Sequence, residues 1–256
     1  MASKQFLSFR LGGEYGHFRK YNTTTSPLSY SLPGPTALAG ILGAVLGMER
    51  EDSKGQVREG QEHLRAAFAE RRAQWAVQVI RPVKKAYAAF NLINTASWRT
   101  HYRLDGKAHK GRTQIEFELL KEPEYRIFLA WEHPRLEELA ERLAHRHHHF
   151  TPYLGLSQWT AQLRGEGLVE AQELPATQDW QDCHSAINLS RLPQEGTPLH
   201  FGPEQHYHTD TLPLAMNEAR EISRYGEVLL ETSGQPLQVQ GAPLWQVEGT
   251  GNFMLL

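Results

Sequence analysis

The segment over residues 33–48 limits the fold more than any other part of the sequence. It reads PGPTALAGILGAVLGM, and its apolar run, residues 38–48, is eleven residues long. A membrane-spanning helix needs about 20 apolar residues, so this segment predicts a buried helix of a globular protein. Thr36 can cap that helix, because threonine side chains accept hydrogen bonds from the free amides of a first turn.

Three glycines, Gly40, Gly43 and Gly47, recur in this helix at helical spacing. A glycine inside a helix costs about 1 kcal/mol relative to alanine. Three such glycines therefore predict that one face of the helix lies close against a sheet or a neighbouring backbone.

The apolar patterns on either side predict an ordered series of further elements. Strands are expected over residues 5–11, within 74–96, and over 113–120, 125–131 and 161–174; helices are expected over 56–72 and 134–145. The series reduces to strand, helix, strand, strand, helix, strand, which is the ferredoxin-like order. We therefore expect an α+β domain over residues 1–174. Short apolar runs separated by Pro and Gly then predict a small β-rich C-terminal appendage over residues 175–256.

Charge is divided unevenly along the chain although the net charge is only −2. The first 130 residues carry 20 Lys and Arg against 12 Asp and Glu, and the remainder carries 7 against 17. The front half is therefore suited to a polyanion and the back half to protein or solvent. The single cysteine, Cys183, excludes an internal disulfide and a Cys-rich zinc site. Without a secretory signal at the N-terminus, we expect a cytoplasmic protein with no membrane contact.

The loop over residues 16–31 is the first candidate binding site. It is unusually long for a connection between a first strand and a first helix, and it contains no acidic residue. Basic residues interleaved with aromatic ones are typical of proteins that bind single-stranded nucleic acid. The candidate RNA-binding residues here are Arg19, Lys20, Tyr21, Asn22 and Tyr30. The alternative is a solvated loop that covers a sheet edge.

The segment over residues 97–112, between two predicted strands of a hairpin, is the second candidate site. Its Asp105-Gly106 pair is typical of a hairpin turn, and Asp105 is its only acidic residue. A basic hairpin tip is suited to a phosphate backbone. The candidate RNA-binding residues are Trp98, Arg99, His101, Tyr102, Arg103, Lys107, Lys110 and Arg112. The alternative is an exposed loop with no binding role.

Histidines form two further groups, for which we expect no metal. Residues 145–149 read HRHHH, but the HExxH metalloprotease motif is absent and neighbouring histidines at a helix end point in different directions. Their charge could instead favour the helix C-terminus. His200, His206 and His208 near Asp210 form a looser set. Nucleophile-elbow, P-loop and paired-carboxylate signatures are absent, so neither a cofactor nor a catalytic residue is predicted.

The segment from Phe18 to Met48 resembles the N-terminal signature of the CRISPR-associated Cas-five proteins. These are RAMP-type subunits of the type I effector complex, Cascade. The matching residues are Phe18-Arg19, Ser29-Tyr30 and residues 35–47, and residues 79–94 and 150–157 are also similar. The resemblance covers most of residues 4–174 and is closest to the type I-B branch.

The resemblance implies a ferredoxin-like, RRM-related core with a long β-hairpin thumb, which matches residues 97–112, and a variable C-terminal part. It implies a subunit that caps the 5′ handle of the CRISPR RNA in antiviral defence. Expected partners are the crRNA, the backbone subunit and the large subunit of Cascade, and target DNA near the PAM end is a further candidate. One branch of the family, in type I-C, cleaves precursor RNA with Tyr, Lys and His residues, but no such triad can be assigned here. We therefore expect a non-catalytic RNA-binding subunit.

Three alternatives remain open at this point. The first is a metal-independent endoribonuclease that processes precursor CRISPR RNA, with His101 or His109 as general base. The second is a metal-dependent hydrolase built on residues 145–149. The third is an assembly-only subunit whose basic surface contacts an acidic protein.

Overall fold

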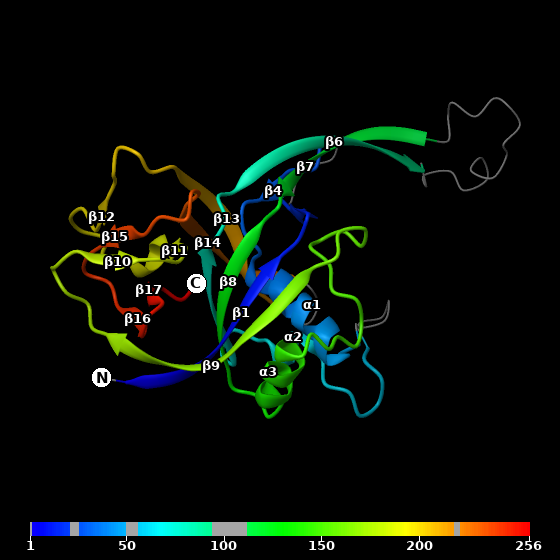
Figure 1. Cartoon of the computed structure of the whole chain (residues 1–256), viewed down its shortest axis with the longest axis horizontal. Coiled ribbons are helices and arrows are strands. Elements are labelled where there is room, and N and C mark those ends of the chain that lie inside the picture. Colours follow the sequence, from blue (N-terminus) through cyan, green and yellow to red (C-terminus); the bar gives the residue numbers. More distant parts are fainter. Residues whose placement is uncertain (1, 21–25, 50–55, 94–111, 218–220) are drawn as a thin grey trace, which may run out of the picture.

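A six-stranded antiparallel sheet forms the centre of the protein (Figure 1). The computed structural model describes residues 2–20, 26–49, 56–93, 112–217 and 221–256. Within the sheet the strand order is β17-β16-β9-β1-β8-β5. The strands are β1 (Ser3–Gly12), β5 (Ala73–Val79), β8 (Glu124–Trp131), β9 (Gln162–Leu174), β16 (Leu244–Val247) and β17 (Gly251–Phe253). All neighbouring pairs are antiparallel.

Strand β1 lies in the interior of this sheet and is buried on both sides. Leu7, Phe9 and Leu11 point into the main hydrophobic core, whereas Phe6 belongs to a second cluster on the opposite face. Since successive side chains of a strand point to opposite faces, this division follows from the sequence alternation. The predicted strand over residues 5–11 is confirmed.

Helices α1 (Pro35–Leu46) and α3 (Leu136–Ala144) contribute Leu38, Leu42, Leu139 and Leu143 to the main core. The prediction that Thr36 caps α1 is wrong: the N-cap is Gly34, and no side chain caps the helix. Pro35 occupies the first turn, where an amide hydrogen would have no intrahelical partner. The predicted helix over residues 134–145 is confirmed.

The three glycines of the helix segment have different roles. Gly47 ends α1 with φ of +71°, and the amide of Met48 donates to the carbonyl oxygen of Gly43 at 2.8 Å. At Gly43 a Cβ would lie 2.5 Å from Leu64 Cδ1, whereas a Cβ at Gly40 would meet no atom within 4 Å. A Cβ at Gly47 would lie 2.6 Å from the ring of His149, so a close approach is found at Gly43 and Gly47 and not at Gly40, in both cases by a side chain rather than by a backbone.

The predicted helix over residues 56–72 is wrong. Helix α2 spans only Leu64–Ala67. Gly60 has φ of +81°, which interrupts a right-handed helix. The apolar residue Phe68 follows α2, and its ring stacks on Trp131 with centroids 4.5 Å apart. The amphipathic pattern therefore indicates that apolar side chains of this segment are buried, but it does not indicate how long the helix is.

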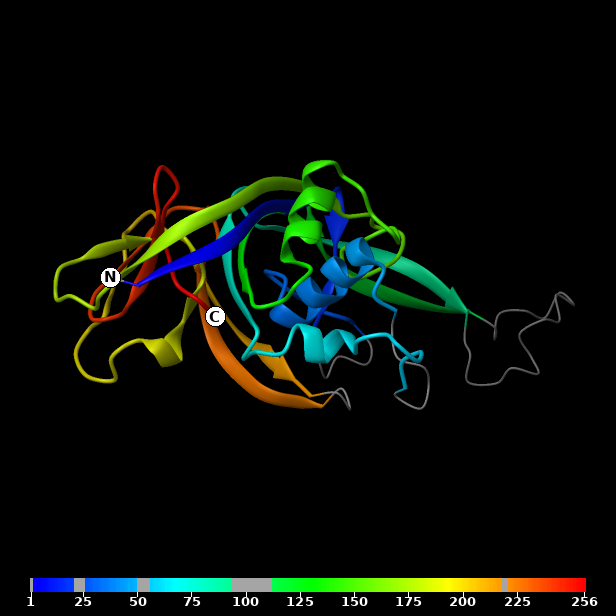
Figure 2. The ribbon, with the colours of Figure 1, turned by 90° about the horizontal axis from the view of Figure 1, so that it is seen from below.

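A long hairpin, β6 (Lys84–Ile93) and β7 (Arg112–Lys121), extends away from the central sheet (Figure 1 and Figure 2). Its ten register pairs run from Lys84–Lys121 to Ile93–Arg112. The predicted pairing of strands on both sides of residues 97–112 is confirmed, and residues 94–111 lie outside the described residues. Two short strands, β3 (Phe18–Arg19) and β4 (Ser29–Tyr30), pair with each other, and β2 (Tyr15–Gly16) pairs with β7.

The C-terminal region is rich in short strands and shares the main core. Its two three-stranded sheets have the orders β10-β15-β12 and β11-β14-β13. Leu212, Val228 and Leu256 all lie in the main core cluster. The bounds are β10 (Gln181–Cys183), β11 (Ile187–Asn188), a 3₁₀ turn (Leu189–Arg191), β12 (Leu199–His200), β13 (Tyr207–Met216), β14 (Ile222–Glu231) and β15 (Leu237–Val239). The division after residue 174 stays a prediction.

The protein is thus a mostly β fold with a curled antiparallel sheet and few helices in its described part, which is compatible with a RAMP-like fold. The last strand, β17, closes the face of the sheet opposite α1 and α3, because Phe253 contacts Phe6 and Phe128 there. None of the described helices is long and apolar enough to cross a membrane.

Candidate nucleic-acid interface

The first candidate loop leaves the body of the protein as a small hairpin. Phe18 pairs with Tyr30 and Arg19 with Ser29, and the amide of Lys20 donates to the carbonyl oxygen of Leu28 at 2.8 Å. Residues 21–25, between the two arms, lie outside the described residues. The hairpin therefore fixes both ends of the loop.

Glu118 of β7 joins this small hairpin to the long hairpin. Its carboxylate accepts hydrogen bonds from Lys85 Nζ at 2.9 Å, the amide of Ser29 at 3.1 Å and the hydroxyl of Tyr87 at 3.1 Å. Its own amide donates to the carbonyl oxygen of Pro27 at 3.0 Å. One buried carboxylate thus connects β4, β6 and β7.

The environment of Glu118 favours its charged form. Burial alone raises the pKa of this carboxyl, but the hydrogen bonds donated by Lys85, Ser29 and Tyr87, with the charge of Lys85, outweigh burial and hold the pKa below its ordinary value. The carboxylate is therefore ionised at neutral pH and can hold the Lys85 ammonium.

Asp210 of β13 anchors the other side of the small hairpin. Its carboxylate pairs with Lys20 Nζ, accepts from the amide of Ser31 at 3.4 Å and lies 3.1 Å from His208 Nε2. Burial raises the pKa of Asp210, but the contacts with His208 and Lys20 outweigh it and lower the pKa. A residue of the C-terminal region thereby fixes the N-terminal loop.

The apolar face of the long hairpin packs on an aromatic cluster. Phe90 contacts Phe117 and Trp159 edge-on at 5.2 Å and 5.8 Å, and Phe117 contacts the ring of His17 at 5.3 Å. His17 is buried, and its Nδ1 donates to the carbonyl oxygen of Glu118 at 2.8 Å. Because burial lowers the pKa of His17, the ring is neutral at physiological pH. It is a structural residue of the hairpin base.

The described candidate residues have three different environments. Arg19 is exposed, whereas Lys20 is partly buried, pairs with Asp210 and lies with Nζ 5.5 Å from the centroid of the Tyr30 ring. Tyr30 is only 6% exposed and belongs to the main core. The structure brings these three residues together, with Arg19 as the solvent-facing member.

The remaining candidates belong to the long hairpin or to the connection between β3 and β4 of the small hairpin. Arg112 is the first residue of β7 and pairs with Ile93, so residues 94–111 connect the distal ends of the two strands. Outside the described residues lie Tyr21, Asn22, Trp98, Arg99, His101, Tyr102, Arg103, Lys107 and Lys110.

Sequence reasoning did not assign to the interface the two acidic residues that hold it together. Asp210 has a visible signal, because it shares the inward register of β13 with Leu212 and Leu214, where an acid requires a partner. Glu118 has none, since it alternates with Phe117 and Leu119 and its pattern is that of a solvated strand face. Its role arises only from packing against β4.

The histidine run follows the C-terminal end of helix α3. His145 is the C-cap, and its Nδ1 lies 3.0 Å from the carbonyl oxygen of Glu141 in the last turn. His149 packs against α1 at Gly47, where a Cβ would lie 2.6 Å from its ring. Over the part of the chain that the structure describes, no three His, Cys, Asp or Glu residues are grouped as a metal site.

Comparisons with known proteins identify a family from the sequence and a similar fold in a solved structure. The family profile described as "CRISPR-associated protein (Cas_Cas5)" matches residues 6–225. A chain of a solved "CRISPR RNA-guided surveillance complex" is similar with a TM-score of 0.53 and 15% identity, over 92% of this chain and 91% of that chain. A second structure, "Crystal structure of Cas protein", has a TM-score of 0.47 and 16% identity, over 90% and 95% of the two chains. No curated protein matches the sequence.

Proposed function

This chain belongs to the CRISPR-associated Cas-five (Cas5) family, and from this premise we propose that it is a non-catalytic RNA-binding subunit of a type I CRISPR effector complex. In this proposal it caps the 5′ handle of the crRNA and contacts the backbone and large subunits of Cascade during antiviral defence. Target DNA near the PAM end is a further proposed partner. The resemblance favours the type I-B branch, and the proposed location is the cytoplasm.

The observation that carries the proposal is the joint at Glu118. This carboxylate holds Ser29 of the small hairpin against Lys85 and Tyr87 of the long hairpin. The loop over residues 20–28 and the segment over residues 94–111 are thereby attached to one support. Attachment of the exposed Arg19 and of the cation-rich segment between β6 and β7 to one support favours contacts with phosphates of a single RNA strand.

The topology supports an RRM-related, ferredoxin-like interpretation of the core. Within the order β9-β1-β8-β5, α1 follows β1 and α3 follows β8 along the chain. RRM domains stack bases on aromatic residues of their sheet. Here the stacking position over Phe128 is occupied by Phe253. We therefore place the RNA on the hairpin loops rather than on the sheet.

The absence of catalysis is part of the proposal. Metal-independent RNA cleavage needs a general base within reach of a ribose hydroxyl. The described histidine nearest the hairpin joint, His17, is buried and bonded to a backbone carbonyl, so it does not supply that base. Incubation of the pure protein with precursor CRISPR RNA in EDTA should leave the RNA intact. Specific cleavage would favour the endoribonuclease alternative.

RNA binding is tested by removing three cations of the thumb segment. Replacing Arg99, Arg103 and Lys110 by alanine should weaken binding of a fluorescent handle RNA by the complex. Each phosphate contact on a single strand contributes about 0.7 to the slope of log affinity against log salt, so the slope should fall by about 2.

A matched control removes three exposed cations that belong to neither hairpin, Arg71, Arg146 and Arg164. This control has the same charge change and should leave the slope nearly unchanged. Equal slopes for the two triple variants would reject the thumb, and wild-type RNA affinity in the thumb variant with full assembly would favour the assembly-only alternative.

A further inference from the structure

Tyr87 of β6 has the most exposed of the large hydrophobic side chains in the described part of the chain, at 62%. Exposure alternates along this strand, so that Lys85, Tyr87, Ala89 and Asn91 are exposed, whereas Phe90 packs on the aromatic cluster at the hairpin base. Since successive side chains of a strand point to opposite faces, the long hairpin has one packed face and one open face. Tyr87 lies on the open face.

The hydroxyl of Tyr87 fixes the position of its ring. It donates to the buried carboxylate of Glu118 at 3.1 Å, and this carboxylate is held in turn by Lys85 and by the amide of Ser29. A side chain whose polar end is tied in this way loses little further freedom when a ligand covers its face. The exposed ring is therefore already oriented, at the junction of the long and the small hairpin.

The neighbours of Tyr87 on the open face leave space beside the ring and supply hydrogen-bonding groups. Ala89, two residues along the strand, has only a methyl group and pairs in register with Glu116. Asn91 follows and pairs with Gln114, and both of these amide side chains are exposed. Such amides carry a donor and an acceptor, which match the edges of nucleobases. A flat ring laid on Tyr87 would extend over Ala89 toward this pair of amides.

The chemistry of the open face favours a base over a phosphate or an apolar protein segment. The exposed carboxylate of Glu116 would repel a phosphate placed over Ala89, whereas the exposed cation Arg19 lies on the small hairpin, across the Glu118 joint. Over positions 85–91 and 114–118 of this face, the only purely aliphatic side chain is the methyl group of Ala89. An apolar segment would therefore find little to pack against.

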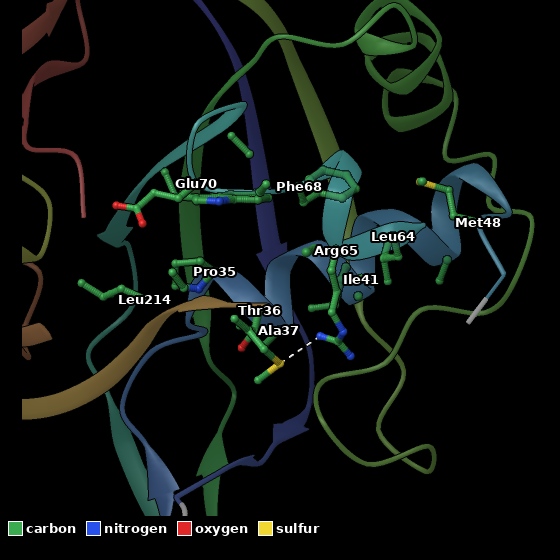
Figure 3. Close-up of a pocket in the computed structure, with 18 of the residues that line it drawn as sticks. Pro35, Thr36, Ala37, Ile41, Met48, Leu64, Arg65, Phe68, Glu70 and Leu214 are labelled. Carbon is green, nitrogen blue, oxygen red and sulfur yellow. Dashed lines mark hydrogen bonds between the residues drawn. The ribbon is translucent and has the colours of Figure 1, made fainter. Parts of the chain in front are cut away.

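Two other aromatic rings that could stack on a base are covered by the protein itself. Tyr30 of the small hairpin is only 6% exposed. Phe68 lines a groove of about 770 Å³ between α1, the segment of α2 and β13 (Figure 3). Its ring stacks on Trp131 and Trp75, with centroids 4.5 Å and 5.9 Å apart. In contrast to these two rings, Tyr87 presents its face to solvent.

We propose that Tyr87 stacks on one nucleobase of the bound RNA and that Asn91 and Gln114 contact the edge of that base. The inference rests on the proposed function, because the RNA is the strand that the hairpin loops hold. Stacking on an aromatic ring tolerates every base, since each base has a flat face. The pair of amides therefore determines which base is preferred at this position.

Three variants test the stacking. Tyr87→Leu removes the ring and should weaken binding of handle RNA by the assembled complex about tenfold. Its salt dependence should stay that of the wild type, because a stacked base releases no counterions. Tyr87→Phe keeps the ring face and should bind within about threefold of the wild type. The control Phe201→Leu removes another exposed ring, in the C-terminal region, and should leave the affinity unchanged.

Two results would contradict the stacking of Tyr87. One is wild-type affinity in Tyr87→Leu. The other is an equal loss in Tyr87→Phe and Tyr87→Leu, which would assign the effect to the hydrogen bond with Glu118.

A scan with abasic nucleotides locates the stacked base. Handle RNAs that each lack one base are bound to complexes that contain the wild type or Tyr87→Leu. At one position, loss of the base should weaken binding to the wild type about tenfold and binding to the variant no further, because both changes remove the same contact. Additive losses at every position would overturn the proposal.

The preference for one base is tested at the position that the scan locates. The double variant Asn91→Ala and Gln114→Ala should reduce the affinity differences among RNAs with each of the four bases there. Unchanged differences would reject the role of the two amides. If the wild-type complex did not bind handle RNA, the proposed function would fail as well. Wild-type binding without any effect of Tyr87→Leu would contradict this inference alone.

Discussion

Phe253 stacks face to face on Phe128, with ring centroids 4.2 Å apart and ring planes inclined by 5°. Phe6 meets the same Phe253 ring edge-on at 5.2 Å, and all three rings are almost fully buried. The chain thus fills the outer face of its own sheet with a ring from its C-terminal strand. Phe253 therefore contributes both to the stability of the sheet and to the covering of that face, together with Val247 and Leu255.

Phe253→Ala should destabilise the protein by about 3–5 kcal/mol, because it removes a buried ring from between two others. Phe253→Leu keeps most of the apolar volume and should cost less. Urea unfolding followed by tryptophan fluorescence measures both changes. If Phe253→Ala unfolded at the wild-type urea concentration, the stacked cluster would not support the sheet.

Glu118→Ala should lower the affinity for handle RNA even though it removes a negative charge near the proposed RNA path. The reason is that Lys85 and Ser29 lose the partner that fixes the small hairpin to the long one. The loss of these hydrogen bonds should also cost about 2–3 kcal/mol of stability.

Glu116 provides the matched control, because it lies two residues away on the same strand and is exposed. Glu116→Ala has the same charge change and should leave affinity unchanged or slightly raised. Fluorescence anisotropy at two salt concentrations compares the variants. Equal affinities of the two variants would show that the Glu118 joint does not position the RNA-binding loops.

The ionised carboxylate of Glu166 on the outer sheet face should make the free energy of unfolding depend on pH in the acidic range. Burial raises the pKa of Glu166, but hydrogen bonds from Arg126, Ser8 and Arg10 outweigh it and lower the pKa to about 2. Because the folded-state pKa lies below the ordinary value of 4.5, this stabilisation is fully present above about pH 4.5 and is lost as the pH falls toward 2.

Glu166→Gln removes that titration. The variant should be less stable than the wild type at pH 7, and the difference should shrink between about pH 4.5 and pH 2. Thermal unfolding across this range measures it. A difference that stayed constant with pH would exclude Glu166 as the group responsible.

Gly155→Ala should disrupt the base of the first loop. Gly155 has φ of +86°, and a Cβ there would lie 1.7 Å from the carbonyl oxygen of His17, so the backbone must move. Gly167 has φ of +103° with open space around it, so Gly167→Ala should cost only the left-handed strain of about 1–2 kcal/mol. Melting temperatures should therefore fall further for Gly155→Ala. Equal losses would mean that the contact with His17 relaxes freely.

Secondary structure is predicted best from the sequence where a periodic pattern of apolar residues marks one buried face of a strand or helix. Strand β1, the pairing of β6 with β7, and α3 follow from alternation or helical periodicity. The region of α2 shows the limit, because Leu64 and Phe68 are apolar at helical spacing while Gly60 breaks the helix with a positive φ. Periodicity indicates which face is buried, whereas the positive φ of Gly60 prevents a continuous helix and the cap at His63 sets the first helical residue, Leu64.

The candidate interface is less predictable, because its joints are long-range contacts. Basic and aromatic residues mark the loops in the sequence, but nothing there indicates that Tyr30 enters the core or that Lys20 meets an aspartate of β13. Such contacts depend on which strands the fold brings together. Composition can therefore identify a binding segment without identifying which of its members face solvent.

The ion pair of Lys20 with Asp210 joins positions 190 residues apart. During synthesis, the first loop therefore leaves the ribosome long before its partner strand exists. A nascent or prematurely terminated chain that stops before β13 has no Asp210 to hold Lys20 and Ser31. The contacts that fix this loop can therefore form only near the end of translation. A complete chain has a fixed loop, and a truncated chain does not.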